Sequence, residues 1–379
     1  MNNKTVVNLV ISSVIAIFFV SFVYALDEQS CVKFTGTGTF TLQGTLNNVK
    51  ETTDTLKEIK RNVGIYIYSM RITKELDRSK KISLKFKCGR GLGLENPESL
   101  TYVSLSNVDQ TTDNNGKNTQ LKISEFFYQQ SIKDKFIVSF GKLDFTSHFA
   151  DNEYAKDKNT QFITDIFACD KSVCQIPQRL AIKLSYVLTP KFNISYGYFV
   201  TDIEHIDASG VNIFQITYKH ADKNGTCKTY IWENNNHDLR ENNLKAGKYG
   251  FGISIDREVN NVLAIFGRFG YKNSCSTKDT KDSIMPISVS WNSGMQLKGS
   301  ILSKSRINDT IGIAIGQIYL KSIKNNNMPE TAMELYYRIC LNKNIAITPA
   351  IQYIKNPKCG NFSKNNNIFC YCVRTQFAF

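Results

Sequence analysis

Acid–base or nucleophilic catalysis on this chain would have to use its four histidines. They fall in predicted loops or at the ends of predicted strands: His148, His205, His220 and His237. Asp202 and Asp207 flank His205, which is typical of a solvated loop. No Gly-x-Ser-x-Gly motif and no paired-carboxylate catalytic motif stands near any of the four, so a Ser/His or Asp/His centre is not indicated. The sequence therefore predicts no enzyme, no metal site and no cofactor.

A different chemistry is open to charged and aromatic residues that alternate with apolar ones. Charged groups give directional hydrogen bonds to solute hydroxyls, and an aromatic face stacks on the C–H side of a ring. The candidates for solute contact are Arg179, Lys183, Trp232, Arg268, Glu334, Tyr336, Arg338 and Arg374. Each of them could instead form an ion pair that stiffens the wall of a sheet.

The element that would position such residues is clearest at the C-terminus. From Phe369 to Phe379 the odd positions are Phe, Tyr, Val, Thr, Phe and Phe, and the even ones are Cys, Cys, Arg, Gln and Ala. Strict alternation with period two predicts a strand with one apolar and one polar face. A chain that ends on such a strand is typical of a transmembrane β-barrel, whose terminal Phe379 would be recognised by the barrel-assembly machinery. A soluble sandwich is the alternative.

The N-terminus has the pattern of a secretion signal. Residues 1–25 carry one charge, Lys4, before a mainly apolar run that closes on Val23-Tyr24-Ala25. A basic start, an apolar middle and a small-x-small site predict a cleaved signal peptide. The alternative is a single membrane anchor, since the run is nearly long enough to span. We therefore expect a signal at 1–25 and one barrel domain at 26–379.

Alternating runs recur along the rest of the chain and predict an all-β protein. They lie near 31–46, 62–72, 79–90, 121–131, 136–144, 178–188, 192–201, 211–219, 226–233, 249–257, 262–271, 286–305, 310–320, 331–340, 345–354 and 369–379. Sixteen is an even number, and most runs approach the ~9–11 residues with which a tilted strand crosses a bilayer. The pattern predicts a closed, antiparallel transmembrane barrel of about sixteen strands.

The connections between these runs alternate in length. Short turns, such as 133–135, 189–191, 307–309 and 342–344, alternate with longer polar segments, such as 145–177, 234–248 and 272–285. Short periplasmic turns and long outer loops are the signature of outer-membrane barrels. The 145–177 segment follows the fifth strand and could fold into the pore. Its polar residues Asp151, Glu153 and Lys156, with Asp144 just before it and His148 near its start, suit that position, although a plain surface loop fits equally well.

The polar residues of the clearest strands can be assigned to the lumen. Leu180, Ile182 and Leu184 alternate with Arg179 and Lys183. The same reasoning places Arg268, Glu334, Tyr336, Arg338, Arg374 and Gln376 inside. An Arg or Lys facing lipid near the midplane would cost ~2–4 kcal/mol, which makes the inward assignment the cheaper one.

The net charge indicates which partners the protein could meet. The formal net charge is +14, and much of the excess lies in predicted loops, where it would meet lipopolysaccharide phosphates and outer-membrane lipid. A nucleic-acid role is excluded in practice by the export signal.

The ten cysteines are unusual for an outer-membrane barrel. Cys169 and Cys174 could close a small disulfide loop in an oxidising periplasm, while Cys370 and Cys372 would share the lumen face of the last strand.

Several runs resemble a known family. They are Glu125-Phe126-Phe127-Tyr128-Gln129-Gln130, Phe140-Gly141-Lys142-Leu143-Asp144, Gln161-Phe162, Pro177-Gln178, Ser290-Trp291-Asn292, Asp309-Thr310-Ile311-Gly312-Ile313, Glu330-Thr331-Ala332-Met333-Glu334-Leu335-Tyr336-Tyr337-Arg338 and Thr348-Pro349-Ala350-Ile351-Gln352-Tyr353-Ile354-Lys355-Asn356-Pro357. With these residues the chain resembles the carbohydrate-selective porin (OprB) family of Gram-negative outer membranes. The resemblance covers roughly 120–379.

The resemblance implies a sixteen-stranded outer-membrane channel through which sugars diffuse passively, with charged and aromatic side chains at a constriction. It implies no cofactor and no catalytic step. A general or anion-selective diffusion porin on the same barrel is the alternative, because the residues themselves favour sugar only through the family. A surface adhesin would need longer or more patterned loops. The pattern fits either a monomer or a homo-oligomer such as a trimer.

Overall fold

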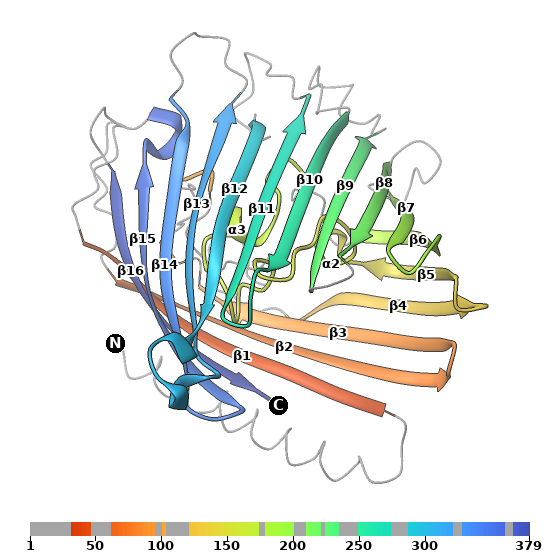
Figure 1. Ribbon diagram of the computed structural model, residues 1–379, viewed down its shortest axis with the longest axis horizontal. Coiled ribbons are helices and arrows are strands. Elements are labelled where there is room, and N and C mark those ends of the chain that lie inside the picture. The colour runs from red at the N-terminus through yellow and green to blue at the C-terminus, as the bar shows by residue number, and fades with distance from the viewer. Residues whose placement is uncertain are drawn as a thin grey trace.

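The computed structural model describes residues 32–46, 62–91, 93–94, 101–103, 121–173, 179–200, 210–220, 224–234, 249–273, 287–320, 328–360 and 367–379. These residues form sixteen strands in one closed barrel, each paired antiparallel to its neighbours in sequence, with β1 paired to β16 (Figure 1). The strands are β1 Val32–Thr45, β2 Asn62–Asp77, β3 Lys80–Arg90, β4 Lys122–Ile132, β5 Phe136–Leu143, β6 Arg179–Val187, β7 Phe192–Val200, β8 Gly210–Lys219, β9 Gly225–Asn234, β10 Tyr249–Glu258, β11 Leu263–Lys272, β12 Ile287–Lys298, β13 Thr310–Leu320, β14 Glu330–Cys340, β15 Ile345–Lys355 and β16 Ile368–Ala378. The predicted fold class and strand number are confirmed.

Helical turns are short. They are α2 Phe145–His148, α3 Asp165–Ala168, and the 3₁₀ turns η2 Gly299–Ile301, η3 Lys304–Arg306 and η4 Pro357–Gly360. Within the described part of the chain, no helix has the length and apolar character needed to cross a membrane. The expected signal at 1–25 lies outside the described residues.

The two ends of the barrel sequence close it directly. Gly36 on β1 donates its N–H to the Phe379 carbonyl oxygen at 2.8 Å, and Phe379 donates back to the Gly36 carbonyl at 3.0 Å. A Cβ added at Gly36 would overlap the Phe379 ring. Only glycine leaves room there, so the C-terminal aromatic residue packs on the strand to which its backbone pairs.

Period-two alternation sets the two faces of each strand. On β10 the side chains of Phe251, Ile253 and Ile255 are exposed on the outer surface, whereas Ser254 and Asp256 are buried inside. On β16, Phe369 and Phe377 point outward and Cys370, Cys372, Arg374 and Gln376 lie inside. The outside is therefore apolar and the inside polar, as the sequence predicts.

One short turn shows how local sequence ends a strand. Lys133 and Asp134 both adopt positive φ, 52° and 55°, and Lys135 donates to the Ile132 carbonyl at 3.2 Å. Two successive left-handed residues twist a tight connection in the sense that a β-hairpin requires, and Asp tolerates that conformation. The predicted turn at 133–135 is confirmed.

The prediction of one strand over 286–305 is wrong. Strand β12 ends at Lys298, and η2 and η3 fill an eleven-residue connection to β13 in place of the predicted turn at 307–309. Gly299 starts the connection because a Cβ there would overlap the Arg306 carbonyl oxygen. The Ser303 side chain accepts from the Ser305 N–H and caps η3. These local interactions end the strand although the apolar residues Ile301 and Leu302 extend its pattern.

Candidate functional site

Residues 144–173, here called the internal segment, leave β5 and fold into the barrel, where Figure 1 shows α3 behind strands β11 to β13. Their backbone bonds to inward-facing side chains far apart around the wall. Lys183 on β6 donates to the His148 carbonyl oxygen at 2.8 Å, and Gln296 on β12 donates to the Tyr154 carbonyl at 2.6 Å. Of the two positions that the sequence left open for this connection, the pore and the outer surface, the described residues take the one inside the barrel.

Apolar residues in two parts of the internal segment explain why it stays inside. At its start, Phe145 and Phe149 pack on Phe199 of β7 with ring centroids 5.0 and 5.9 Å away. Further along, Phe162 meets Tyr336 of β14 edge-on at 4.9 Å. Burying an aromatic side chain contributes about 1.5–3 kcal/mol, so the two clusters together favour the folded-in position strongly.

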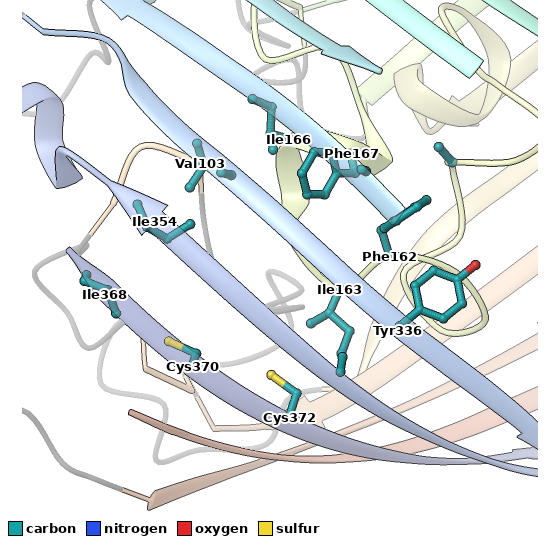
Figure 2. Close-up of a cluster of buried hydrophobic side chains, with 14 of the residues drawn as sticks. Val103, Phe162, Ile163, Ile166, Phe167, Tyr336, Ile354, Ile368, Cys370 and Cys372 are labelled. Carbon is teal, nitrogen blue, oxygen red and sulfur yellow. The ribbon is translucent and has the colours of Figure 1, made fainter. Parts of the chain in front are cut away.

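The second cluster is a small hydrophobic core within the lumen. Figure 2 shows Phe162, Ile163, Ile166 and Phe167 of the internal segment facing strands β14 to β16. Its wall side is contributed by Tyr336, Ile354, Ile368, Cys370 and Cys372, and Val103 from the connection between β3 and β4 joins it. This part of the interior is packed and excludes solvent.

Glu334 anchors the turn that begins α3. Its carboxylate accepts the N–H groups of Ile163 and Thr164, both at 2.8 Å, and the Thr164 hydroxyl at 2.6 Å. Gln352 on β15 also donates to that hydroxyl at 2.8 Å. Ile163 and Thr164 directly precede α3, and their buried N–H groups need acceptors, which this carboxylate supplies.

Two buried arginines donate hydrogen bonds to backbone carbonyl oxygens of the internal segment. Arg268 on β11 donates to the carbonyl oxygens of Phe167 at 2.8 Å and Ala155 at 2.7 Å. Arg374 on β16 donates to the carbonyls of Gln161 at 2.8 Å and Lys158 at 2.5 Å. A guanidinium presents several donors in one plane, which suits it to join two carbonyls from separate turns. Arg268 and Arg374 therefore position the internal segment.

Asp170 ties the far end of the internal segment to the wall. It accepts hydrogen bonds from Tyr230 on β9 and, at 2.7 Å, from Ser290 on β12. Two strands, β10 and β11, lie between them; on β11 Gly270 pairs with Ser290, and a Cβ at Gly270 would overlap the Asp170 carboxylate. The segment can reach the wall at this point only because residue 270 has no side chain.

Asp165 makes ion pairs within the internal segment itself, with Lys158 and Lys171. Burial acts to raise the pKa of Asp165, but the two ammonium groups outweigh it and hold the pKa well below its ordinary value of 3.8. Cys169, which follows α3, is disulfide-bonded. Cys174, its expected partner, lies outside the described residues.

The start of the internal segment contacts β4. The His148 Nε2 atom lies 3.6 Å from the Glu125 carboxylate, which also pairs with Arg71 of β2. The His148 ring meets Phe127 edge-on, with centroids 5.5 Å apart. These contacts fix the direction in which the segment leaves β5.

The wall formed by β2, β3 and β4 differs from the rest of the interior. Register places Ser69, Lys87 and Lys122 side by side on its inner face, and Arg71, Lys85 and Glu125 in the row beside them. The side chain of Arg71 is 32% exposed, and Lys85, Lys87 and Lys122 are half-buried. Arg268 and Arg374, by contrast, are 4% and 0% exposed.

All eight residues predicted to contact solute face inward, but the structure gives them different surroundings. Arg268, Glu334 and Arg374 bond to the internal segment, and the Tyr336 ring is buried against Phe162. Trp232 is buried in the first aromatic cluster. Lys183 bonds to the segment and lies 4.9 Å over the Phe149 ring. Arg179 is exposed, and Arg338 is half-buried and bonds to Gln376 at 3.2 Å. Contact with a solute stays a prediction for all eight.

Several wall residues that hold the internal segment were not predicted as site residues, among them Glu125, Ser290, Asn292 and Gln352. Asn292, for example, donates to the Ile166 carbonyl at 2.6 Å. The available signal was their position on the inner faces of strands. Polarity alone does not show which inner residues bond to a folded-in segment and which face water.

A closed barrel of sixteen antiparallel strands, apolar outside and polar inside, with the connection after its fifth strand folded inward, is the architecture of a porin. The structure of Pseudomonas putida OprB at high pH matches with a TM-score of 0.70 at 15% identity, over 92% of this chain and 94% of that chain. The low-pH structure of the same porin gives 0.56 at 14%, over 92% of each chain. A mutant of Rh. blastica porin gives 0.53 at 10%, over 92% of this chain and 100% of that chain. At these identities the likeness establishes the fold.

Comparison of the sequence with protein families is more specific than the likeness to solved structures. Residues 211–379 match the family described as carbohydrate-selective porin, OprB family. The match confirms, for the strands from β8 onward, the resemblance drawn from the sequence. Among curated proteins, no sequence matches this chain.

Proposed function

We propose that this protein is a passive diffusion channel for carbohydrates in a Gram-negative outer membrane. The observation that carries the proposal is the internal segment, which lies within a closed barrel and is fixed to its wall by Glu334, Arg268 and Arg374. A rigid constriction in an otherwise polar lumen discriminates solutes by size and by hydrogen bonding, without a catalytic step or a cofactor. The family match over 211–379 favours sugars as the solutes.

The eight predicted site residues would then have two roles. Arg268, Glu334, Tyr336 and Arg374 act through the internal segment, because their side chains are buried against it. Arg179 and Arg338 are open enough to donate hydrogen bonds to a passing sugar. Lys183 and Trp232 lie between these cases, beside the aromatic cluster of Phe145, Phe149 and Phe199. The indole N–H of Trp232 is buried and has no partner among the described residues.

The proposal includes a route to the membrane. The signal at 1–25 would direct export, and the closing strand β16 with Phe379 would be the element recognised by the barrel-assembly machinery. The exposed outer side chains of β10 and β16 would meet lipid, and basic outer loops would meet lipopolysaccharide phosphates. A homo-oligomer stays a prediction.

Titration of sugar against single-channel current tests the proposal. The mature protein is inserted into planar bilayers in KCl, and glucose or maltose is added to both sides. We expect stable open channels whose current falls saturably with sugar, and a weaker block in Arg338→Gln. Lys142→Gln on the outer face is the matched loss of charge and should behave as wild type. Channels indifferent to sugar would remove the carbohydrate part, and folded protein without channels would remove the whole proposal.

A further inference from the structure

The connection between β12 and β13, residues 299–309, differs from the other turns at its end of the barrel. Its eleven residues include the 3₁₀ turns η2 and η3, which Figure 1 shows in blue below the lower ends of β12 and β13. The β4–β5, β6–β7, β10–β11 and β14–β15 turns at the same end have only three or four residues. Short turns mark the periplasmic end of an outer-membrane barrel. Since three residues suffice to reverse the chain there, the extra length is available for another purpose.

This connection exposes large aliphatic side chains. Ile301, Leu302 and Ile307 are 58%, 62% and 61% exposed. Leu341, which is 57% exposed, begins the next turn directly after Cys340, and the Cys340 N–H donates to the Asp309 carboxylate at 2.9 Å. Four such side chains on two adjacent turns form an apolar patch, which is typical of a surface that meets a partner or a membrane.

The connection is fixed to the lipid-facing side of the barrel. Asp309 is 2% exposed and accepts the Tyr337 hydroxyl at 2.7 Å. Tyr337 lies on the outer face of β14, in line with the exposed side chains of Met333 and Leu335. The apolar patch is therefore continuous with the surface that would contact acyl chains.

The charged residues around the patch are mainly positive. Lys304, Arg306 and Lys343 are exposed, and Asp309 is the one carboxylate in the segments 299–309 and 341–344. Its two hydrogen bonds engage Asp309, and Arg306 Nη1 lies 3.7 Å from it while remaining 49% exposed. Exposed aliphatic groups beside cations are the composition of a segment that lies in a membrane interface.

We propose that the β12–β13 connection is a lipid anchor in the periplasmic leaflet, with Ile301, Leu302 and Ile307 at the acyl chains and with Lys304 and Arg306 on the phosphates of anionic phospholipids. Charge complementarity favours anionic over zwitterionic headgroups there. A soluble periplasmic partner fits less well, because the bond from Tyr337 to Asp309 holds the connection beside the lipid-facing surface. The anchor does not depend on which solute the channel passes.

Tryptophan fluorescence in lipid vesicles tests the anchor. The full mature protein carries Leu302→Trp or, as an independent second position, Ile307→Trp. Asn261→Trp, at an exposed residue of the short β10–β11 turn, is the positional control. All variants also carry Trp291→Phe, because Trp291 pairs with the outward-facing Phe269 and would itself be quenched by lipid. Vesicles contain equal amounts of phosphatidylglycerol and phosphatidylcholine, with brominated acyl chains on one or the other, and iodide is the aqueous quencher.

Two charge variants are combined with Leu302→Trp. Lys304→Gln/Arg306→Gln removes the two cations of the connection. Lys191→Gln/Lys219→Gln is its matched control, since it removes the same charge from exposed residues elsewhere at this end of the barrel.

We expect brominated chains to quench Leu302→Trp and Ile307→Trp strongly and iodide to quench them weakly, with the reverse for Asn261→Trp. Bromine on phosphatidylglycerol should quench Leu302→Trp about twofold or more better than bromine on phosphatidylcholine. Lys304→Gln/Arg306→Gln should abolish that preference, and Lys191→Gln/Lys219→Gln should retain it.

Three results would overturn the anchor. Quenching of both new tryptophans by iodide alone would place the patch in water, and protection from both quenchers would place it against protein, such as a second copy of this chain. Equal quenching by the two brominated lipids would remove the preference for anionic headgroups. None of these results bears on the diffusion channel, which the current measurements test separately.

Discussion

Two walls of the same barrel use the same inward positions in opposite ways. On β11 to β16, inner charged side chains such as Arg268, Glu334 and Arg374 are buried and bond to the backbone of the internal segment. On β2 to β4, inner side chains such as Lys85 and Lys87 stay partly open and neighbour one another. Alternation decides only that a residue faces inward. Its role depends on whether the internal segment covers it.

The covered wall resembles the interior of a soluble protein. A buried charge is costly unless it is paired and hydrogen-bonded, and here the partners are backbone N–H and carbonyl groups of the internal segment. The segment in turn needs these partners, because its own backbone groups are buried. On the open wall Arg71, Lys85 and Lys87 are only partly buried, so part of each side chain remains exposed.

Glu334→Ala should have the largest effect on the covered wall. It leaves two buried N–H groups without their partner, at about 1–3 kcal/mol each, and should release the turn before α3. We expect a lower free energy of unfolding in urea, together with larger and noisier single-channel currents. Glu334→Gln retains an acceptor and should lie between alanine and wild type. A quiet, wild-type channel in Glu334→Ala would show that this carboxylate does not hold the segment.

A pair of glycines on β11 tests the same wall without changing charge. A Cβ at Gly270 would overlap Asp170, whereas a Cβ at Gly267 has nothing nearer than the Asn292 carbonyl oxygen at 3.7 Å. Gly270→Ala should destabilise the fold by about 1–3 kcal/mol through overpacking and widen the channel, while Gly267→Ala should change little. Urea unfolding and conductance measure both. Equal behaviour of the two variants would contradict the close approach of Asp170.

The smallest expected effect is that of pH on the internal segment. The folded pKa of Asp165 is depressed by Lys158 and Lys171, so its stabilisation is complete above the ordinary value of 3.8 and is lost as pH falls through the lower folded value. Current noise that depends on these ion pairs should stay constant from about pH 7 to pH 5 and rise only below about pH 4.

Asp165→Asn is the control for that pH effect. It removes the titrating group, so its noise should be raised at neutral pH and should change less on acidification. A wild-type transition between pH 5 and 7 that survives in Asp165→Asn would assign the effect to another group.

The sequence predicts the barrel well and the site only in part. Strand number and the inward direction of Arg268, Glu334 and Arg374 follow from period two, because that period is a local property of the chain. Their partners do not follow, since Arg374 bonds to carbonyls more than two hundred residues away in sequence. The end of β12 was missed for the opposite reason: a serine cap and one glycine override an apolar pattern that continues.

A pair of serine-to-cysteine variants tests the division of the two walls most directly. Ser69 faces inward on β2 and is half-buried, and Ser290 faces inward on β12, 2% exposed and bonded to Asp170. A charged, water-soluble thiol reagent is added to open channels of Ser69→Cys and Ser290→Cys, with wild type giving the background from native cysteines. Our account predicts rapid loss of current in Ser69→Cys and wild-type behaviour in Ser290→Cys. Rapid modification of Ser290→Cys, with none of Ser69→Cys, would contradict it.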